Sequence, residues 1–367
     1  MSMANKKLRG AIIGYGYIAS KGHLPAYTER SRITGDVEIV AIADICPERR
    51  DIVLQAHPEI RLYPTAEILI EQEAEEIDFI DICTPPAFHA AIADMALKHG
   101  LHVLCEKPLT TTLEEAKGII STARSAKRVL YPCHNYRHAP VIKAIREILD
   151  TNQIGHVRSV TLSTFRNTHA KGVTEWHSHW RREHKYSGGG IAMDHGSHTF
   201  YLAFDWLGSY PTHITAKMHN LDIEHYDTED NFAAVLTFPR GVAHVSLSWT
   251  AGVRKVIYTI QGDKGAITVD DDNIEIATQI KTQGPDVAQG AIEWAVSRRS
   301  IASDWMDASH VQWFKSLFNE FFDAIREDNF VSEQTISSFR CIELIQQAYA
   351  SSQQNSVELK LGTPVPT

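Results

Sequence analysis

The chain has 367 residues, a length that predicts roughly two domains of about 150 residues each. Its 36 basic and 45 acidic side chains give a net charge of −9, which disfavours a general nucleic-acid or anionic-membrane surface. Its five cysteines are scattered and form no C-x-x-C pair, which argues against a disulfide scaffold or a structural zinc. With no apolar run of membrane-spanning length and no signal peptide evident, we expect a cytoplasmic protein without nucleic-acid or membrane partners.

Short apolar runs alternate with helical stretches in the first part of the chain. Strands are predicted at residues 8–14, 37–44, 77–83, 102–105 and 128–132, with helices at 90–99 and 113–126. This alternation predicts a parallel, doubly wound α/β sheet, which we assign to a dinucleotide-binding Rossmann domain at residues 1–133. We expect residues 27–36 to form an extended loop.

The pattern then changes to long β-type runs. Strands are predicted at residues 157–165, 212–219, 231–238, 242–249, 255–261 and 266–269, and helices at 140–149, 311–326 and 336–352. These elements predict an α+β domain at residues 134–367 with a large open, mostly antiparallel sheet. We expect the last helix to pack back on the Rossmann domain and the sheet to form a homodimer or homotetramer.

The turn after the first strand has the form of a dinucleotide-binding turn. Its glycines allow a close backbone approach to a pyrophosphate at a helix N-terminus. Asp44 ends the second strand, where a carboxylate can hold the adenosine ribose and repel a 2′-phosphate. NAD is therefore the expected cofactor, while Arg49 and Arg50 leave NADP as the less favoured alternative. The expected contacts from the turn are Gly14, Gly16, Tyr17 and Ile18.

Two further motifs place reactive side chains. Lys107 precedes Pro108, so its backbone is restricted to extended conformations, and a partly desolvated lysine can stabilise an alkoxide or share a proton. Further along, three glycines at residues 188–190 precede Asp194 and His198, whose i, i+4 spacing puts both on one face of a helix. The alternatives are a surface lysine after a strand and a capping aspartate beside a packed histidine.

Together these segments resemble the family named for glucose–fructose oxidoreductase, inositol dehydrogenase and the rhizopine-catabolism protein MocA, over nearly the whole chain. The resemblance implies that Lys107 contacts the substrate hydroxyl and the cofactor region, that His198 accepts the hydroxyl proton, and that Asp194 tunes His198 and binds substrate. Relatives often place an acid near Tyr201, and this chain departs from that pattern. Further cofactor contacts are expected from Thr84, Pro85, His89, Glu106 and Asn135.

The loop before the glycines is aromatic and basic. Trp180 and Arg181 lie there, and an aromatic face beside polar donors suits a sugar ring. Residues 166–185 carry five basic and two acidic side chains, which favours a carboxylate or phosphate on the substrate, with Arg181 as the best contact. A solvated loop is the alternative. The histidines of this loop lack a tight ligand pattern, so we expect no metal.

The sequence thus predicts an NAD(P)-dependent dehydrogenase that transfers hydride between nicotinamide and a secondary hydroxyl of a sugar, cyclitol or sugar derivative. Two alternatives stay open. One is a glycosidase of the same fold that retains NAD and oxidises C3 transiently. The other is a non-catalytic regulator that senses the nucleotide.

Overall fold

The first part of the chain forms the predicted Rossmann sheet. The computed structural model describes residues 6–281, 292–302 and 309–366. The parallel sheet has the order β3-β2-β1-β4-β5-β6. Its strands are β1 Leu8–Ile13, β2 Val37–Ala43, β3 Arg61–Tyr63, β4 Phe79–Ile82, β5 His102–Cys105 and β6 Leu130–Pro132. The strand order reverses between β1 and β4, and open α/β sheets bind ligands at such a point.

Helices cover this sheet. They are α1 Leu24–Thr34, α2 Pro47–Ala56, α3 Ala66–Glu73, α4 His89–Lys98 and α5 Leu113–Ala126, with a π-helical turn, η2 Ala19–His23, leading into α1. The prediction of an extended loop at residues 27–36 was wrong, because most of this segment lies in helix α1. Its polar composition hid the one strong anchor, Tyr27, which is fully buried and stacks on Phe318 at 4.0 Å between ring centroids.

The second part forms the predicted large sheet. Its strands are β7 Val157–Phe165, β8 His213–His219, β9 Asn231–Phe238, β10 Gly241–Ser248, β11 Lys255–Gly262, β12 Gly265–Asp270, β13 Asn273–Lys281, β14 Ile292–Ser300 and β15 Leu359–Lys360. They follow the order β14-β13-β12-β11-β7-β10-β9-β8-β15. Neighbouring strands are antiparallel apart from β7 and β10, which run parallel. The mostly antiparallel sheet is confirmed.

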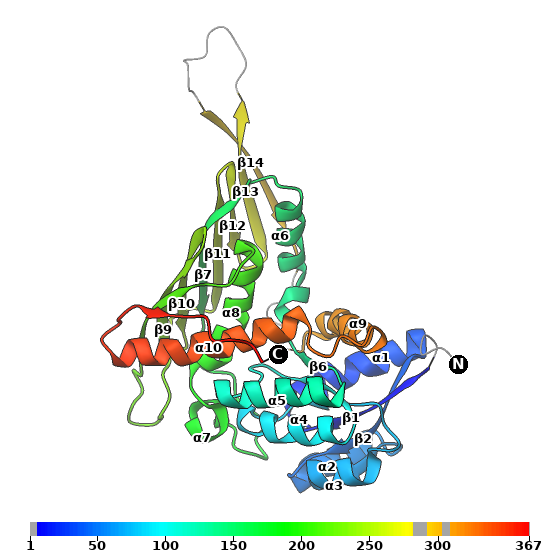
Figure 1. Ribbon diagram of the computed structural model, residues 1–367. Coiled ribbons are helices and arrows are strands. Elements are labelled where there is room, and N and C mark those ends of the chain that lie inside the picture. The colour runs from blue at the N-terminus through cyan, green and yellow to red at the C-terminus, as the bar shows by residue number, and fades with distance from the viewer. Residues whose placement is uncertain (1–5, 282–291, 303–308, 367) are drawn as a thin grey trace.

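One face of this sheet is covered by helices, as Figure 1 shows. They include α6 Pro140–Asp150 and α8 Ile191–Leu207, while α9 Val311–Arg326 and α10 Glu333–Gln353 run between the large sheet and the Rossmann domain. Along β9 buried and exposed side chains alternate, so the opposite face of the sheet stays open there. Phe314 and Phe318 of α9 join the Rossmann core, and Phe339 of α10 does so as well. The last two helices therefore tie the domains together.

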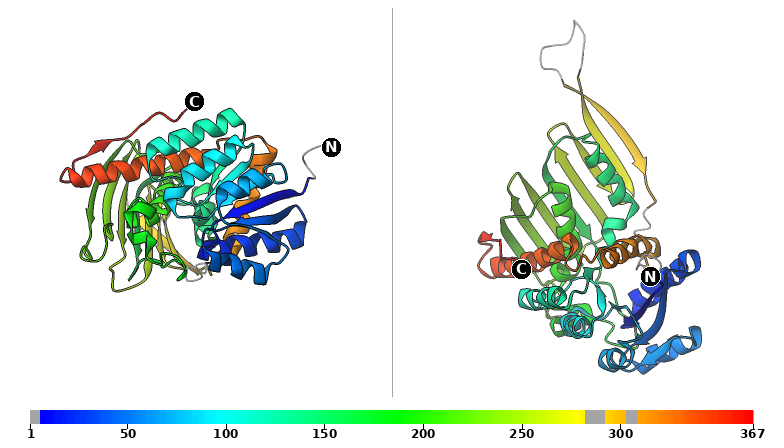
Figure 2. Two further views of the ribbon diagram at one scale, coloured as in Figure 1. Left: turned by 90° about the horizontal axis from the view of Figure 1, so that it is seen from below. Right: turned by 45° about the vertical axis from the view of Figure 1, so that its right-hand side comes forward.

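The hairpin of β13 and β14 projects away from the rest of the molecule, as both Figure 1 and the right view of Figure 2 show. The sequence reading did not include these strands, nor β3 and β15. The alternation of Ile274, Glu275 and Ile276 was a signal that could have identified β13. No helix among the described residues is long and apolar enough to cross a membrane.

Candidate active site

A cavity of about 590 Å³ lies where the two domains meet. Its lining comes from the turns after β1, β2, β4 and β5, from α8 and from the loop around residues 170–181. The structure brings nearly all of the expected site residues to it: Gly14, Gly16, Tyr17, Ile18, Asp44, Thr84, Pro85, Glu106, Lys107, Asn135, Trp180, Arg181, Asp194 and His198. His89 is the exception.

His89 does not line the cavity, and its side chain forms contacts in the interior of the Rossmann domain. It is fully buried, and its two ring nitrogens lie 2.8 Å from the carbonyl oxygens of Thr84 and Pro108. The ring therefore links the turn after β4 to the turn after β5. It positions Thr84 and Pro85 rather than reaching the cavity itself.

The turn after β1 fits a dinucleotide. Gly14 has φ +90°, and a Cβ there would lie 3.0 Å from Thr84 Cγ2 and 3.1 Å from the Cys83 backbone, so the conformation and the crowding both require glycine. A Cβ on Gly16 would meet no protein atom within 4 Å. Because Gly16 lines the cavity, its missing side chain leaves room for a ligand to approach the backbone.

Asp44 joins two loops at this end of the cavity. Its Oδ2 accepts the Tyr15 backbone N–H at 2.6 Å, and its Oδ1 accepts the Cys46 backbone N–H at 2.8 Å. Each carboxylate oxygen has a second lone pair, so ribose hydroxyls can still be bound. The residues present therefore fit an adenosine ribose next to Gly14 and Gly16.

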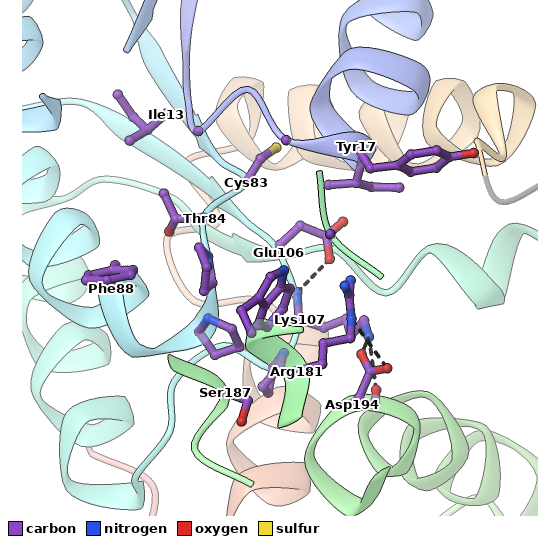
Figure 3. Close-up of a pocket in the computed structure, with 18 of the residues that line it drawn as sticks. Ile13, Tyr17, Cys83, Thr84, Phe88, Glu106, Lys107, Arg181, Ser187 and Asp194 are labelled. Atoms are coloured by element: carbon purple, nitrogen blue, oxygen red, sulfur yellow. Dashed lines mark hydrogen bonds and ion pairs between the residues drawn. The ribbon is translucent and has the colours of Figure 1, made fainter. Parts of the chain in front are cut away.

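Lys107 and Asp194 meet across the domain boundary (Figure 3). Lys107 Nζ donates to Asp194 Oδ1 at 2.7 Å and to the Asp194 carbonyl at 2.9 Å, and the two side chains are only 14% and 15% exposed. Burial acts to raise the pKa of Asp194, but Lys107, His195 and Arg181 outweigh it and hold that pKa well below its usual range. Asp194 is therefore ionised and anchors the lysine amine.

His198 has different neighbours from those expected. Its Nδ1 lies 2.7 Å from Tyr201 Oη, and its ring stacks on Tyr136 at 3.8 Å between centroids. Asp194 instead lies against Lys107 and, at 3.4 Å, against His195 Nδ1. Burial, followed by the nearby Lys107 charge, holds the pKa of His198 well below its usual range, so the imidazole is neutral at physiological pH.

Tyr201 supports His198 at the position where the sequence lacks an acid. Its hydroxyl accepts the Tyr136 backbone N–H at 3.2 Å and is fully buried. A hydroxyl can either donate to or accept from Nδ1, so it holds the ring for both neutral tautomers of His198. Sequence reasoning noted the missing acid and did not foresee that tyrosine takes its place.

Glu106 is held by a buried pair that the sequence reading missed. His23 Nδ1 lies 2.6 Å from Asp81 Oδ2, and its Nε2 lies 3.1 Å from Glu106 Oε1. Glu106 Oε2 also accepts the Lys107 backbone N–H at 3.0 Å, which fixes the start of the lysine segment. Burial opposes the charged form of His23, but Asp81 raises its pKa well above the usual value. An aspartate inside the apolar strand β4 was the available signal.

Two of the five basic side chains at residues 166–185 line the cavity. Lys171 and Arg181 line it, whereas Arg182 turns away to pair with Asp230. The Arg181 guanidinium lies 4.2 Å from the Trp180 ring centroid, and its Nε lies 3.7 Å from Asp194 Oδ2. Arg181 is thus placed beside the Lys107–Asp194 pair.

One group of metal-type ligands stands close together within the described residues. It consists of His23, Asp81 and Cys133, all buried in the Rossmann domain. His23 already uses both ring nitrogens on Asp81 and Glu106, so this group is explained as part of the support for Glu106. The histidines of the loop before α8 do not form such a group in the described structure.

Two family models match the chain. The model described as "Oxidoreductase family, NAD-binding Rossmann fold" matches residues 8–134, and the one described as "GFO/IDH/MocA C-terminal domain" matches residues 142–268. The chain is 26% identical over 310 residues to D-glucoside 3-dehydrogenase of Escherichia coli, covering 78% of this chain and 85% of that protein. It is 28% identical to inositol 2-dehydrogenase of Rhizobium meliloti, covering 74% and 79%.

Solved structures share the whole fold. Levoglucosan dehydrogenase in complex with NADH superimposes with a TM-score of 0.80 at 20% identity, covering 97% of this chain and 100% of that one. An oxidoreductase from Agrobacterium radiobacter with NAD⁺, L-tartaric acid and magnesium gives 0.80 at 21% identity, covering 97% and 98%. The chain therefore belongs to the glucose–fructose oxidoreductase, inositol dehydrogenase and MocA family, and it is an NAD-binding oxidoreductase.

Proposed function

We propose that the protein is a dehydrogenase for a secondary hydroxyl of a sugar, cyclitol or sugar derivative. The observation that carries this proposal is the meeting of Lys107, Asp194 and His198 in the cavity that also contains the Gly14–Gly16 turn. A single cavity thus combines a dinucleotide-binding turn with groups that can hold and deprotonate a hydroxyl.

Each side chain has a distinct task in this proposal. When bound, NAD supplies the acceptor for the hydride that leaves the substrate carbon. Lys107, oriented by Asp194, donates hydrogen bonds to the substrate oxygen and stabilises negative charge that develops there. Neutral His198, held by Tyr201, takes the hydroxyl proton. Glu106, ionised beside His23, supports the backbone of Lys107.

Two observations support a sugar-like substrate. The cavity presents the Trp180 ring together with polar groups, and sugars have apolar C–H faces rimmed by hydroxyls. The names of the curated relatives include a glucoside dehydrogenase and an inositol dehydrogenase. Arg181 adds a donor that suits a carboxylate or phosphate on such a molecule.

The test is reduced-nicotinamide absorbance with NAD and a panel of sugars, inositols, uronates and nucleotide sugars. A dehydrogenase releases NADH in proportion to the substrate consumed. A panel that yields no NADH with any member would contradict the proposal. A glycoside cleaved without net NADH would identify the glycosidase that retains its cofactor.

We also propose that the open face of the large sheet joins subunits. Several of its apolar side chains are exposed, among them Val235 at 39%, Trp294 at 53% and Val296 at 52%. Trp294 and Val296 are two residues apart on β14 and so form an exposed apolar pair on one face, of the kind found at interfaces. Light scattering after gel filtration tests this, and a monomer at micromolar concentration would contradict it.

A further inference from the structure

Arg49 raises the question of which dinucleotide the cavity prefers. It lies in the first turn of α2 and lines the cavity together with Asp44 and Ile45. In Rossmann domains an arginine near the end of the second strand can accommodate the 2′-phosphate of NADP. Arg50, its neighbour, does not line the cavity and donates to the Asp44 carbonyl at 2.6 Å. Arg49 is therefore the side chain on which binding of a 2′-phosphate would depend.

Protein groups already hold Arg49. Its Nε donates to the Tyr15 carbonyl at 2.8 Å, and its Nη1 donates to Glu175 Oε1 at 3.1 Å. The guanidinium also lies over the Tyr15 ring, 5.4 Å from the centroid. The side chain is only 9% exposed. A 2′-phosphate would have to compete with Glu175 for this guanidinium.

Glu175 comes from the other domain. It belongs to the loop between β7 and the short helix at Trp180–Arg182, and residues 170–173 of the same loop line the cavity. Its carbonyl lies 3.7 Å from Cys46 Sγ, just before α2. Thr174 Oγ1 donates to Glu175 Oε2 at 2.9 Å, so the carboxylate is fixed from both sides. Backbone N–H, Thr174 and Arg49 lower the pKa of Glu175, which keeps it ionised.

Other charges around Arg49 act in the same direction. Asp44 and Glu67 line the cavity. Close by, Oε2 of Glu48 lies 3.0 Å from Sγ of Cys46. Glu175 pairs with the Arg49 guanidinium itself. The carboxylates of Asp44, Glu67 and Glu175 disfavour an additional phosphate beside Arg49.

We propose that Glu175 adds to the preference for NAD that Asp44 favours, because it neutralises and immobilises Arg49 and so denies NADP its 2′-phosphate contact. The proposal rests on the proposed function only in that the ligand is a nicotinamide dinucleotide. It assigns a specificity role to a residue of the second domain, far from the Rossmann turn in sequence.

Calorimetric titration of the whole protein with NAD and with NADP tests the proposal without any substrate. We expect wild-type protein to bind NAD more tightly. Glu175→Gln should tighten NADP binding on the order of tenfold, since a charged guanidinium–phosphate bond becomes available, and should leave NAD within about twofold. In the Glu175→Gln background, Arg49→Gln should abolish the gain.

The matched control is Glu183→Gln. Glu183 directly follows the short helix at Trp180–Arg182 and contacts Lys185 and His177 rather than Arg49, and its replacement by Gln changes net charge equally. We expect no gain in NADP affinity from it. Unchanged NADP binding by Glu175→Gln, an equal gain from Glu183→Gln, or a wild-type preference for NADP would each overturn the proposal. Wild-type protein that binds neither dinucleotide would overturn the oxidoreductase function with it.

Discussion

Lys107 Nζ lies 2.7 Å from Asp194 Oδ1, although the two residues come from different domains. The Rossmann sheet places the lysine at the end of β5, and the second domain places the aspartate in the first turn of α8. The site therefore forms only when the domains are docked. The α9 helix, whose phenylalanines enter the Rossmann core, maintains that docking.

Lys107→Met should lower turnover by a factor on the order of 10² or more, because groups in general acid–base catalysis typically contribute about that much. Dinucleotide binding should persist, since the turn after β1 is untouched. Steady-state kinetics and calorimetry measure the two quantities. Lys98→Met, which removes an exposed lysine, is the control and should leave both unchanged. Near-wild-type turnover of Lys107→Met would contradict the assigned role.

The pH profile should report His198. Burial and the Lys107 charge lower its pKa well below the usual value, so its neutral, proton-accepting form persists below pH 6.5. We therefore expect kcat/KM to stay level as the pH falls through 6.5 and to decline only at lower pH. In Lys107→Met the decline should move to higher pH, because a positive neighbour is lost. A wild-type decline centred at or above pH 6.5 would speak against His198 as the base.

Arg181→Ala tests the charge of the substrate. If the substrate carries a carboxylate or phosphate, this variant should raise KM more than it lowers kcat, and kcat/KM of the wild type should fall with added salt. Lys185→Ala is the control, because Lys185 lies four residues further along, in the short helix α7 His184–Ser187, and does not line the cavity. If the best substrate is uncharged and kcat/KM does not depend on salt, the substrate carries no group for Arg181 to bind. The role of Arg181 is then its contacts with protein groups such as Asp194 and Trp180.

Local sequence was sufficient for the parts of the site that depend on backbone conformation. Gly14 and Gly16 mark a turn, Lys107 precedes a proline, and Asp194 and His198 share a helix face, so each motif could be recognised from neighbouring residues. The contacts between distant residues could not. Tyr201 supporting His198, His23 joining Asp81 to Glu106, and Glu175 holding Arg49 all depend on packing between elements. The expected loop at residues 27–36 failed for the same reason, since α1 is stabilised by contacts with α9.

Isotope transfer tests the central claim most directly. The substrate found in the panel is labelled with deuterium on its carbinol carbon and incubated with the enzyme and NAD, and the reduced nicotinamide is analysed by mass spectrometry. The account predicts one deuterium in each NADH formed, because hydride moves directly from that carbon. Unlabelled NADH, or deuterium released to water, would contradict it.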